Sequence, residues 1–376
     1  MGALRVGKFA KYLLAEGHDI RIVCAKDQPY AMDHPVEVPD DVISYSRGYD
    51  VNWLPAAVQK LRVWLKSRRA GGLAISGKAK APAASPAGTS SSGLLGRMLN
   101  LYRHVTNIPD SAIGWLFPAL RSARAVTRNW QPDIVFASAP PFTTLIAGRM
   151  IAHRTGAPLV VEYRDRWLED PYGHEAPRFR RWIEGRIEEW CARQAKSIVT
   201  VSEPWAEDYR ARWGKPVAVC YNGFDPDDVA PLDGIEPTVS DKLTILYTGI
   251  IYPERRDPTP LFEALALLGD DRCDIEVKFY GSNVDQLDSM IAGTGQQDIV
   301  TLCAGVPFRE AILLQREADV LLLLQWNNPL EAGNVPGKLF EYLAARRPVL
   351  GIGYEQGVPA HILRERGAGR VLNEPE

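Results

Sequence analysis

The residues with the clearest chemical potential lie near the end of the chain, where a turn leads into a predicted helix. The turn is Asn-Val-Pro-Gly at residues 334–337, and Lys338 follows it. The first backbone N–H groups of a helix have no partner inside it and attract an anion, and the Lys338 ammonium adds positive charge. Glu341 lies on the same helix face and offers two oxygens that can accept hydrogen bonds from a ribose diol. The spacing indicates either a nucleotide site or an ordinary capped helix with a Lys/Glu pair.

Short apolar, β-branched segments alternate with helical periodicity along the chain. They predict buried parallel strands at residues 19–25, 133–141, 158–165, 197–204, 216–225, 243–249, 275–281, 299–305, 320–327 and 347–353. Two of the intervening helical patterns end at Gly17 and Gly156, because glycine suits the left-handed position after a helix. This rhythm predicts an α/β fold made of two Rossmann-like, doubly wound domains.

A change of pattern near residue 225 marks the predicted domain boundary. The Asn222-Gly223 turn ends a strand, and residues 226–240 lack hydrophobic periodicity, which is typical of a linker. We therefore predict an N-terminal domain at residues 1–225 and a C-terminal domain at residues 226–376. Ligands of doubly wound domains bind at the carboxyl ends of the strands, so the residues that follow each strand are candidates. They include Arg164, Asp165, Arg255, Arg256 and Ser282.

The composition is that of an ordinary globular protein. The 376 residues are 46% hydrophobic and 24% charged, and 44 Lys and Arg against 46 Asp and Glu give a net charge of −2. These values argue against disorder and against polyanion binding by the chain as a whole. The five cysteines show no metal-binding spacing and are expected to be reduced core thiols. Because no apolar run reaches about 18 residues and no leader pattern is found, a cytoplasmic location is expected.

One segment departs from this average. Residues 51–109 contain nine basic residues and no acidic residue, and residues 81–93 use only Ala, Pro, Ser, Gly and Thr. The latter stretch cannot bury enough apolar surface to become ordered, so a mobile loop is predicted. Trp53, Trp64 and nearby leucines among the basic residues are suited to an anionic membrane surface. The alternative is a solvated linker beside a packed helix.

Five stretches of the sequence, in matching order, resemble the family 4 retaining glycosyltransferases of the GT-B fold. They are RVGKFAKYLLAEGHDIRIV at 5–23, VVEYRDRWLEDPYG at 160–173, VCYNGFD at 219–225, ILYTGIIYPERRDP at 245–258 and GNVPGKLFEYLAARRPVL at 333–350. The resemblance covers most of the chain except the 51–109 insert. It implies two Rossmann-like domains that face a cleft, with a nucleotide-sugar donor bound by the C-terminal domain.

The resemblance also implies roles for individual residues. A basic residue after the YTG strand and Lys338 would clamp the diphosphate, Glu341 would hold the ribose, and the Tyr-Gly pair that ends the 275–281 strand would line the base pocket. The candidate donor-binding residues are Gly249, Arg255, Arg256, Tyr280, Gly281, Val335, Pro336, Lys338, Leu339 and Glu341. Arg164 and Asp165 would face the acceptor as catalytic candidates, with Asp165 on the acceptor hydroxyl. The alternative is a buried Asp165 paired with Arg164.

The chemistry of such a transfer requires neither a metal nor a cofactor. Negative charge grows on the β-phosphate as the sugar leaves, and fixed cations and helix N–H groups stabilise the transition state more than the ground state. Asp225 and Asp227 have the D-x-D spacing of metal-dependent transferases. Because they follow an Asn-Gly turn, linker and helix-cap chemistry is the preferred interpretation, and no metal site is predicted.

The chain departs from the family pattern in three places. The family has two glutamates eight positions apart, but the residue eight before Glu341 is Gly333, and Glu331 lies two positions off. The usual glycine before RPVL is Arg346. The sequence begins where relatives have a preceding strand and a glycine-rich loop, and it stops before their closing helix. We therefore expect a chain that is truncated at both ends.

Two other groups of residues could bind a ligand, namely the histidines and the tryptophans of one predicted helix. The six histidines show no metal-ligand spacing, and His174, just past the RDRW stretch, is the one candidate for a role. The helix predicted at residues 177–195 carries Trp182 and Trp190 among arginines, as a nucleic-acid stripe would. Its glutamates interleave with the arginines at helical spacing, which favours a salt-bridged surface and no nucleic-acid partner.

These observations predict a retaining, metal-independent transferase. It would move a sugar from a nucleotide-sugar, with UDP favoured, to a glycan or lipid-linked acceptor in surface polysaccharide synthesis, as a peripheral protein on the inner membrane face. Two alternatives stay open. One is a nucleotide-sugar epimerase of the same fold, and the other is a non-catalytic nucleotide-sugar-binding homologue, suggested by Gly333 and the chain ends.

Overall fold

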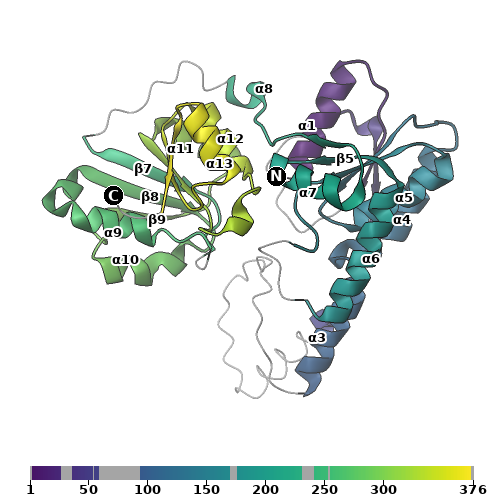
Figure 1. Ribbon diagram of the computed structural model, residues 1–376, viewed down its shortest axis with the longest axis horizontal. Coiled ribbons are helices and arrows are strands. Elements are labelled where there is room, and N and C mark those ends of the chain that lie inside the picture. Colours follow the sequence, from purple (N-terminus) through teal and green to yellow (C-terminus); the bar gives the residue numbers. More distant parts are fainter. Residues whose placement is uncertain are drawn as a thin grey trace, which may run out of the picture.

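The computed structural model describes residues 2–26, 36–53, 55–58, 94–169, 176–230, 241–252 and 255–373. The predicted loop at residues 81–93, most of the predicted linker and His174 lie outside these ranges. Helices and strands alternate in the described chain, every strand pair is parallel, and Figure 1 shows two lobes joined near α8.

The first lobe contains the elements from the N-terminus to β6, followed by a short α8. Its helices are α1 (Gly2–Ala15), α3 (Leu94–Thr106), α4 (Leu116–Val126), α5 (Thr143–Thr155), α6 (Arg178–Gln194), α7 (Glu203–Trp213) and α8 (Pro226–Val229). Its strands are β1 (Ile22–Ala25), β2 (Ile43–Ser46), β3 (Val135–Ala139), β4 (Leu159–Tyr163), β5 (Ala195–Thr200) and β6 (Val217–Val219). The strand predicted at 216–225 is therefore much shorter than expected, because the Asn-Gly turn and its neighbours leave the sheet early.

Strands β3, β4, β5 and β6 form a four-stranded sheet in that order, and β1 pairs with β2 in a separate sheet. Apolar residues of β3–β6 bury themselves against α5, α6 and α7 in one core that includes Leu145, Val161, Ile198 and Trp205. The β1–β2 pair packs on Trp115 and Ala119 beside α4. The apolar run at residues 159–161 of β4 is what a strand covered on both faces requires.

The second lobe is a six-stranded parallel sheet in the order β12-β11-β10-β7-β8-β9. Its strands are β7 (Leu243–Thr248), β8 (Ile275–Gly281), β9 (Val300–Ala304), β10 (Val320–Leu324), β11 (Val349–Ile352) and β12 (Gly369–Leu372), and its helices are α9 (Thr259–Leu267), α10 (Asp288–Thr294), α11 (Phe308–Glu317), α12 (Gly337–Ala345) and α13 (Val358–Glu365). Separate apolar clusters cover the two faces. The strand order reverses between β7 and β10, and the carboxyl ends of these strands mark the place where such sheets bind ligands.

The sequence rhythm missed β2 and β12, each of four residues, although it predicted β1 and β11 of the same length. The two lobes match the predicted pair of α/β units, with strands on either side of residue 225 in different sheets. The five cysteines are free, but only Cys191 is buried and Cys273 is exposed, so the prediction of core thiols holds for one of them. None of the helices formed by described residues is both long and apolar enough to span a bilayer.

Arg346 ends α12 in the left-handed region, with φ +55°. Glycine adopts this conformation without the Cβ clash that costs other residues roughly 1 kcal/mol. We expect Arg346→Gly to raise the free energy of unfolding by about 0.5–1 kcal/mol in urea denaturation. Arg366 ends α13 with φ −87°, so Arg366→Gly is the control and should not stabilise. Equal effects of the two changes would contradict the conformational explanation.

Candidate functional site

The turn after β7 forms the floor of the candidate site. Gly249 has φ +138° and its N–H donates to the carbonyl of Tyr280, with N···O 2.7 Å. Gly281 follows at the end of β8 with φ +156°, and a Cβ there would lie 1.7 Å from the Gly249 oxygen. Both positions therefore require glycine, and the two bare backbones lie close together at the carboxyl ends of adjacent strands.

Lys338 lies directly against this turn. Its Nζ is 3.8 Å from the centroid of the Tyr247 ring, and a Cβ on Gly249 would lie 2.3 Å from it. Burial, together with the Arg256 charge and against the opposing effect of the Glu341 carboxylate, lowers the pKa of Lys338 to about 7. The ammonium is thus held in a poorly solvated place that an anion would stabilise.

The two arginines after β7 lie differently. Arg256 stacks on Tyr252, donates to the Ile250 carbonyl over 3.2 Å and is the cation that depresses the Lys338 pKa. Arg255 stacks on Trp326 just past β10, with 4.8 Å between guanidinium and ring. The sequence left open which arginine accompanies Lys338, and in the structure the Arg256 charge is the one that acts on the pKa of Lys338.

The start of α12 has the form expected of an anion site. Pro336 precedes the helix with extended backbone, and its side chain makes no capping hydrogen bond to the first N–H groups. The carbonyl of Val335 accepts a hydrogen bond of 3.1 Å from Asn222 of the first lobe. Leu339 is fully buried in the core, and its side chain holds the first turn of α12 in place.

Glu341 occupies the second turn of α12. Its Oε2 accepts a hydrogen bond of 3.3 Å from Nε2 of Gln315 on α11, and the same Nε2 donates to Thr248 over 2.9 Å. Gln315 is completely buried. Sequence reasoning missed Gln315, because nothing in its helix marks it out from an exposed glutamine.

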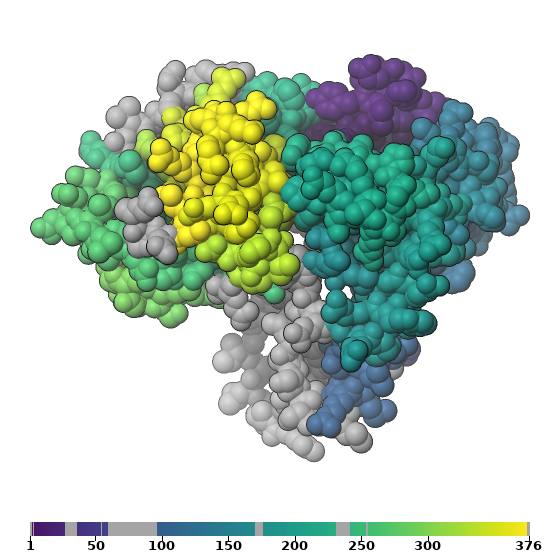
Figure 2. All heavy atoms as spheres, in the orientation of Figure 1, coloured from purple at the N-terminus to yellow at the C-terminus, as the bar shows by residue number. Residues whose placement is uncertain are grey.

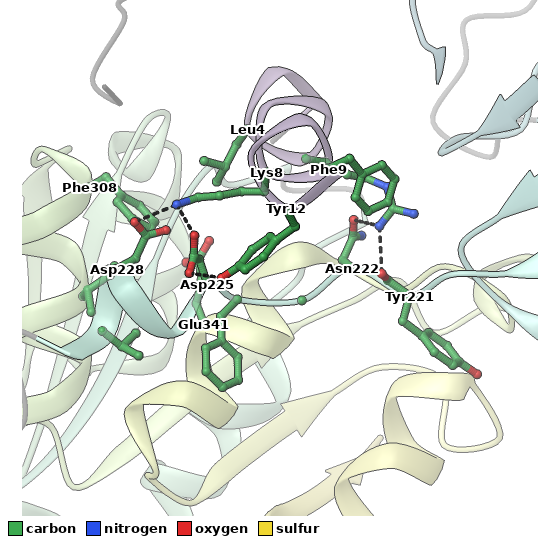
Figure 3. Close-up of a pocket in the computed structure, with 15 residues that line it drawn as sticks. Leu4, Lys8, Phe9, Tyr12, Tyr221, Asn222, Asp225, Asp228, Phe308 and Glu341 are labelled. Carbon is green, nitrogen blue, oxygen red and sulfur yellow. Dashed lines mark hydrogen bonds and ion pairs between the residues drawn. The ribbon is translucent and has the colours of Figure 1, made fainter. Parts of the chain in front are cut away.

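Glu341 also lines a cavity of about 220 Å³ at the meeting of the two lobes, shown in Figure 3. The other walls come from α1, from the segment after β6 and from the start of α11, including Leu4, Tyr12, Asn222, Phe224, Phe308 and Ile312. The cavity places a carboxylate of the second lobe opposite side chains of the first.

A charged cluster closes one side of this cavity. Lys8 and Lys11 on α1 contact the buried carboxylate of Asp225 at 2.6 and 2.8 Å, and the Tyr12 hydroxyl donates to it over 2.6 Å. Asp225 also caps α8 by accepting from the Asp227 N–H, as the linker and helix-cap interpretation predicted. Glu37, Asp225 and Asp228 lie close enough to share a cation, but Lys8 contacts all three and supplies that charge.

Arg164 and Asp165 lie in the first lobe, after β4. Arg164 donates from Nε to the Ser138 hydroxyl over 3.0 Å and from Nη2 to the Pro140 carbonyl. Asp165 is exposed, so the alternative of a buried aspartate was wrong. Sequence reasoning also missed fully buried Glu162, which binds Arg5 of α1 over 2.8 Å.

The structure thus brings together most of the predicted donor-side residues at one sheet edge. Gly249, Arg256, Tyr280, Gly281, Lys338 and Glu341 surround the ends of β7 and β8 and the start of α12. Arg164 donates its hydrogen bonds to Ser138 and Pro140, which belong to its own lobe. On α6, Glu189 pairs with the exposed Arg186 and Arg193, as the salt-bridged surface predicted. Glu184 and Glu188 are instead buried and bind Arg180 and Arg212, so the prediction of a solvated face was wrong for these two glutamates.

The chain is similar to known proteins in one segment of its sequence and in its fold. No curated protein sequence matches the chain, but residues 84–228 match the family model of Glycosyltransferase Family 4. A glycosyltransferase from Rickettsia africae ESF-5 superposes with TM-score 0.52 and 14% identity, over 100% of this chain and 82% of that chain. Sucrose-phosphate synthase from Thermosynechococcus elongatus superposes with TM-score 0.51 and 13% identity. The match covers 70% of this chain and 66% of the synthase chain.

At these identities the superpositions establish the fold alone, and the segment matched by the family model includes β3–β6. The chain thus has the two-lobed GT-B fold of glycosyltransferases, and its residues 84–228 are similar to Glycosyltransferase Family 4.

Proposed function

We propose that this protein transfers a sugar from a nucleotide-sugar donor to a glycan or lipid-linked acceptor. The observation that carries the proposal is the convergence of Lys338, Arg256, Glu341 and the uncapped start of α12 at the reversal point of the second sheet. Cations and helix N–H groups suit a diphosphate, and a carboxylate three residues further on suits a ribose.

The chemistry follows from this placement. Lys338, Arg256 and the α12 N–H groups would bind the diphosphate and stabilise the charge that develops as the sugar–phosphate bond breaks. Glu341 would accept hydrogen bonds from the ribose hydroxyls, and Tyr280 with Gly281 would contact the base. Asp165, exposed on the first lobe, would meet the acceptor hydroxyl. A UDP-linked donor, retention of configuration and independence of metal and cofactor belong to the proposal on the strength of the sequence resemblance.

Calorimetric titration with UDP, GDP and ADP tests the donor site. We expect micromolar binding of one nucleotide, with UDP favoured, and measurably weaker binding by Glu341→Ala. Binding of none of the three would overturn the proposal. Product analysis with the matching nucleotide-sugar separates the alternatives, because an epimerase changes the sugar without an acceptor and a binding protein consumes no donor.

The first lobe offers a surface for the proposed membrane contact. On α3, Met98, Leu101 and Val105 are 54–60% exposed at helical spacing, and Arg97 and Arg103 lie on the same helix. Figure 2 shows α3 in blue at the tip of the first lobe. An apolar stripe with flanking cations suits an anionic lipid interface, and we propose a peripheral location on the inner membrane face on this basis.

Co-sedimentation with phosphatidylserine-containing vesicles checks this surface. Leu101→Asp puts a charge into the exposed stripe, so we expect severalfold weaker binding, and binding of the wild type should fall as salt rises. Leu267 is 76% exposed on α9 of the other lobe, and Leu267→Asp is the control. Equal recovery of the wild type and Leu101→Asp would rule out α3 as the contact.

A further inference from the structure

Gln315 is a fully buried amide between two parts of the candidate site. It lies on α11, and its Nε2 donates one hydrogen bond to the Thr248 hydroxyl at the end of β7 and one to the Glu341 carboxylate on α12. Gly249, which Lys338 contacts, follows Thr248 directly. The Gln315 side chain thus connects the Glu341 carboxylate to the turn at Gly249, against which Lys338 lies.

The orientation of the Gln315 amide leaves its oxygen without a hydrogen bond to any described residue, which costs stability. Its Oε1 is buried and has no hydrogen-bond partner within the part of the chain that the structure describes. An unpaired buried acceptor costs roughly 1–3 kcal/mol, and an apolar side chain of the same length would avoid that cost. If the amide were flipped, Oε1 could accept a hydrogen bond from the Thr248 hydroxyl. The same Oε1 would then face the Glu341 carboxylate, and two acceptor oxygens repel each other. The carboxylate therefore fixes the amide, and the amide in turn fixes the carboxylate.

We propose that Gln315 is a positioning residue that holds Glu341 in the orientation needed to accept hydrogen bonds from the ribose of the donor. This inference rests on the proposed function of Glu341. With Oε2 fixed by Gln315 and Glu341 lining the cavity between the lobes, the carboxylate presents one preorganised set of lone pairs to a diol. Without the amide the side chain would sample several rotamers, and ribose recognition would weaken.

The test compares two ligands that differ only in the ribose hydroxyls. The nucleoside diphosphate that the wild type binds best among UDP, GDP and ADP is titrated beside its 2′,3′-dideoxy analogue. Gln315→Met keeps the length of the side chain and removes the donor, and Gln315→Leu serves as a second variant. We expect about tenfold weaker binding of the ribose nucleotide and affinity for the dideoxy analogue within about twofold of the wild type.

Gln296 provides a matched control in the same lobe. It is also fully buried, and its amide bonds Thr294 and Arg272, away from Glu341. Gln296→Met should lower the melting temperature about as much as Gln315→Met and leave both affinities unchanged. In a Glu341→Ala background, Gln315→Met should have no further effect on nucleotide affinity, because the group it positions is gone.

The outcomes separate the inference from the proposed function. Equal losses for both ligands in Gln315→Met would overturn the positioning role and assign Gln315 to the fold alone. Unchanged affinities in Gln315→Met, together with weak binding in Glu341→Ala, would overturn the inference and leave the ribose site standing. A wild type that binds none of the three nucleotides would overturn both.

Discussion

Replacement of Lys338 by methionine should abolish nucleotide binding and at the same time make the protein more stable. The ammonium lies 3.8 Å from the Tyr247 ring beneath the Gly249 turn, where water and carboxylates compensate it poorly. Methionine fills the same volume and packs on the ring without a charge to desolvate. We expect nucleotide affinity to fall about 100-fold, since a charge-assisted contact to phosphate is lost.

The stability gain has a defined pH dependence. Burial and the Arg256 charge lower the pKa of Lys338 to about 7, whereas lysine in the unfolded chain titrates near 10.5. The folded protein then binds fewer protons between these values, so wild-type stability rises with pH from about 7 toward 10. Lys338→Met should gain about 1–2 kcal/mol at pH 7, and the gain should shrink as the pH approaches 10. Urea denaturation at several pH values measures this.

Lys278→Met is the control for both effects. Lys278 lies on β8 of the same sheet and pairs with Glu276 at 2.5 Å, so its removal should not stabilise the protein or alter nucleotide affinity. Loss of stability in Lys338→Met would mean that the lysine serves the fold. Opposite signs for binding and stability are the signature of a residue kept for a ligand at the expense of the empty site.

The wild type should also take up protons when it binds a nucleotide. A diphosphate beside Lys338 restores its charged form, so affinity should fall as the pH rises above about 7. Arg256, Glu341 and the Tyr247 hydroxyl are the neighbouring ionisable groups, and burial raises the pKa of Tyr247 above its usual value. Calorimetry in Hepes and in Tris, whose ionisation enthalpies differ, reports the proton uptake directly.

The sequence carried the parts of this site that depend on local spacing. Lys338 and Glu341 are three residues apart on one helix face, and the turn at residues 334–337 marks the start of that helix. Helical spacing was therefore enough to predict that the two side chains belong to one site. The roles of Gly249 and Gly281 were predicted from the family resemblance, and the structure places both glycines at the carboxyl ends of β7 and β8. The same rhythm predicted both lobes, and only strands of four residues escaped it.

The missed residues are those whose partners are distant in sequence. Gln315 meets Thr248 and Glu341, which lie 67 and 26 residues away, and Arg5 meets Glu162 across 157 residues. Such pairs follow from the packing of elements, which no local pattern encodes. The exposure of Asp165 was unpredictable for a related reason, because the arginine beside it turns toward Ser138 and Pro140.

Asp225 should prove the most damaging single residue to remove from the region between the lobes. Its carboxylate is 1% exposed and accepts contacts from Lys8, Lys11 and Tyr12 of α1 while capping α8. Burial alone would raise its pKa, but the hydrogen bonds from Lys11, Lys8 and Tyr12 outweigh it and hold the pKa well below its usual range. The carboxylate therefore joins the first helix to the segment that leaves the first lobe.

Asp225→Ala leaves two lysines with fewer counter-charges and α8 without its cap, so we expect a loss of about 3 kcal/mol at pH 7. An acid whose folded pKa is depressed contributes its stability above the unfolded value, so the difference from the wild type should shrink as the pH falls below about 4. Asp227→Ala is the matched control, because that carboxylate is 69% exposed and binds Lys11 alone of the two lysines. Equal losses in the two variants would show that net charge near α1, rather than the buried carboxylate, holds this junction.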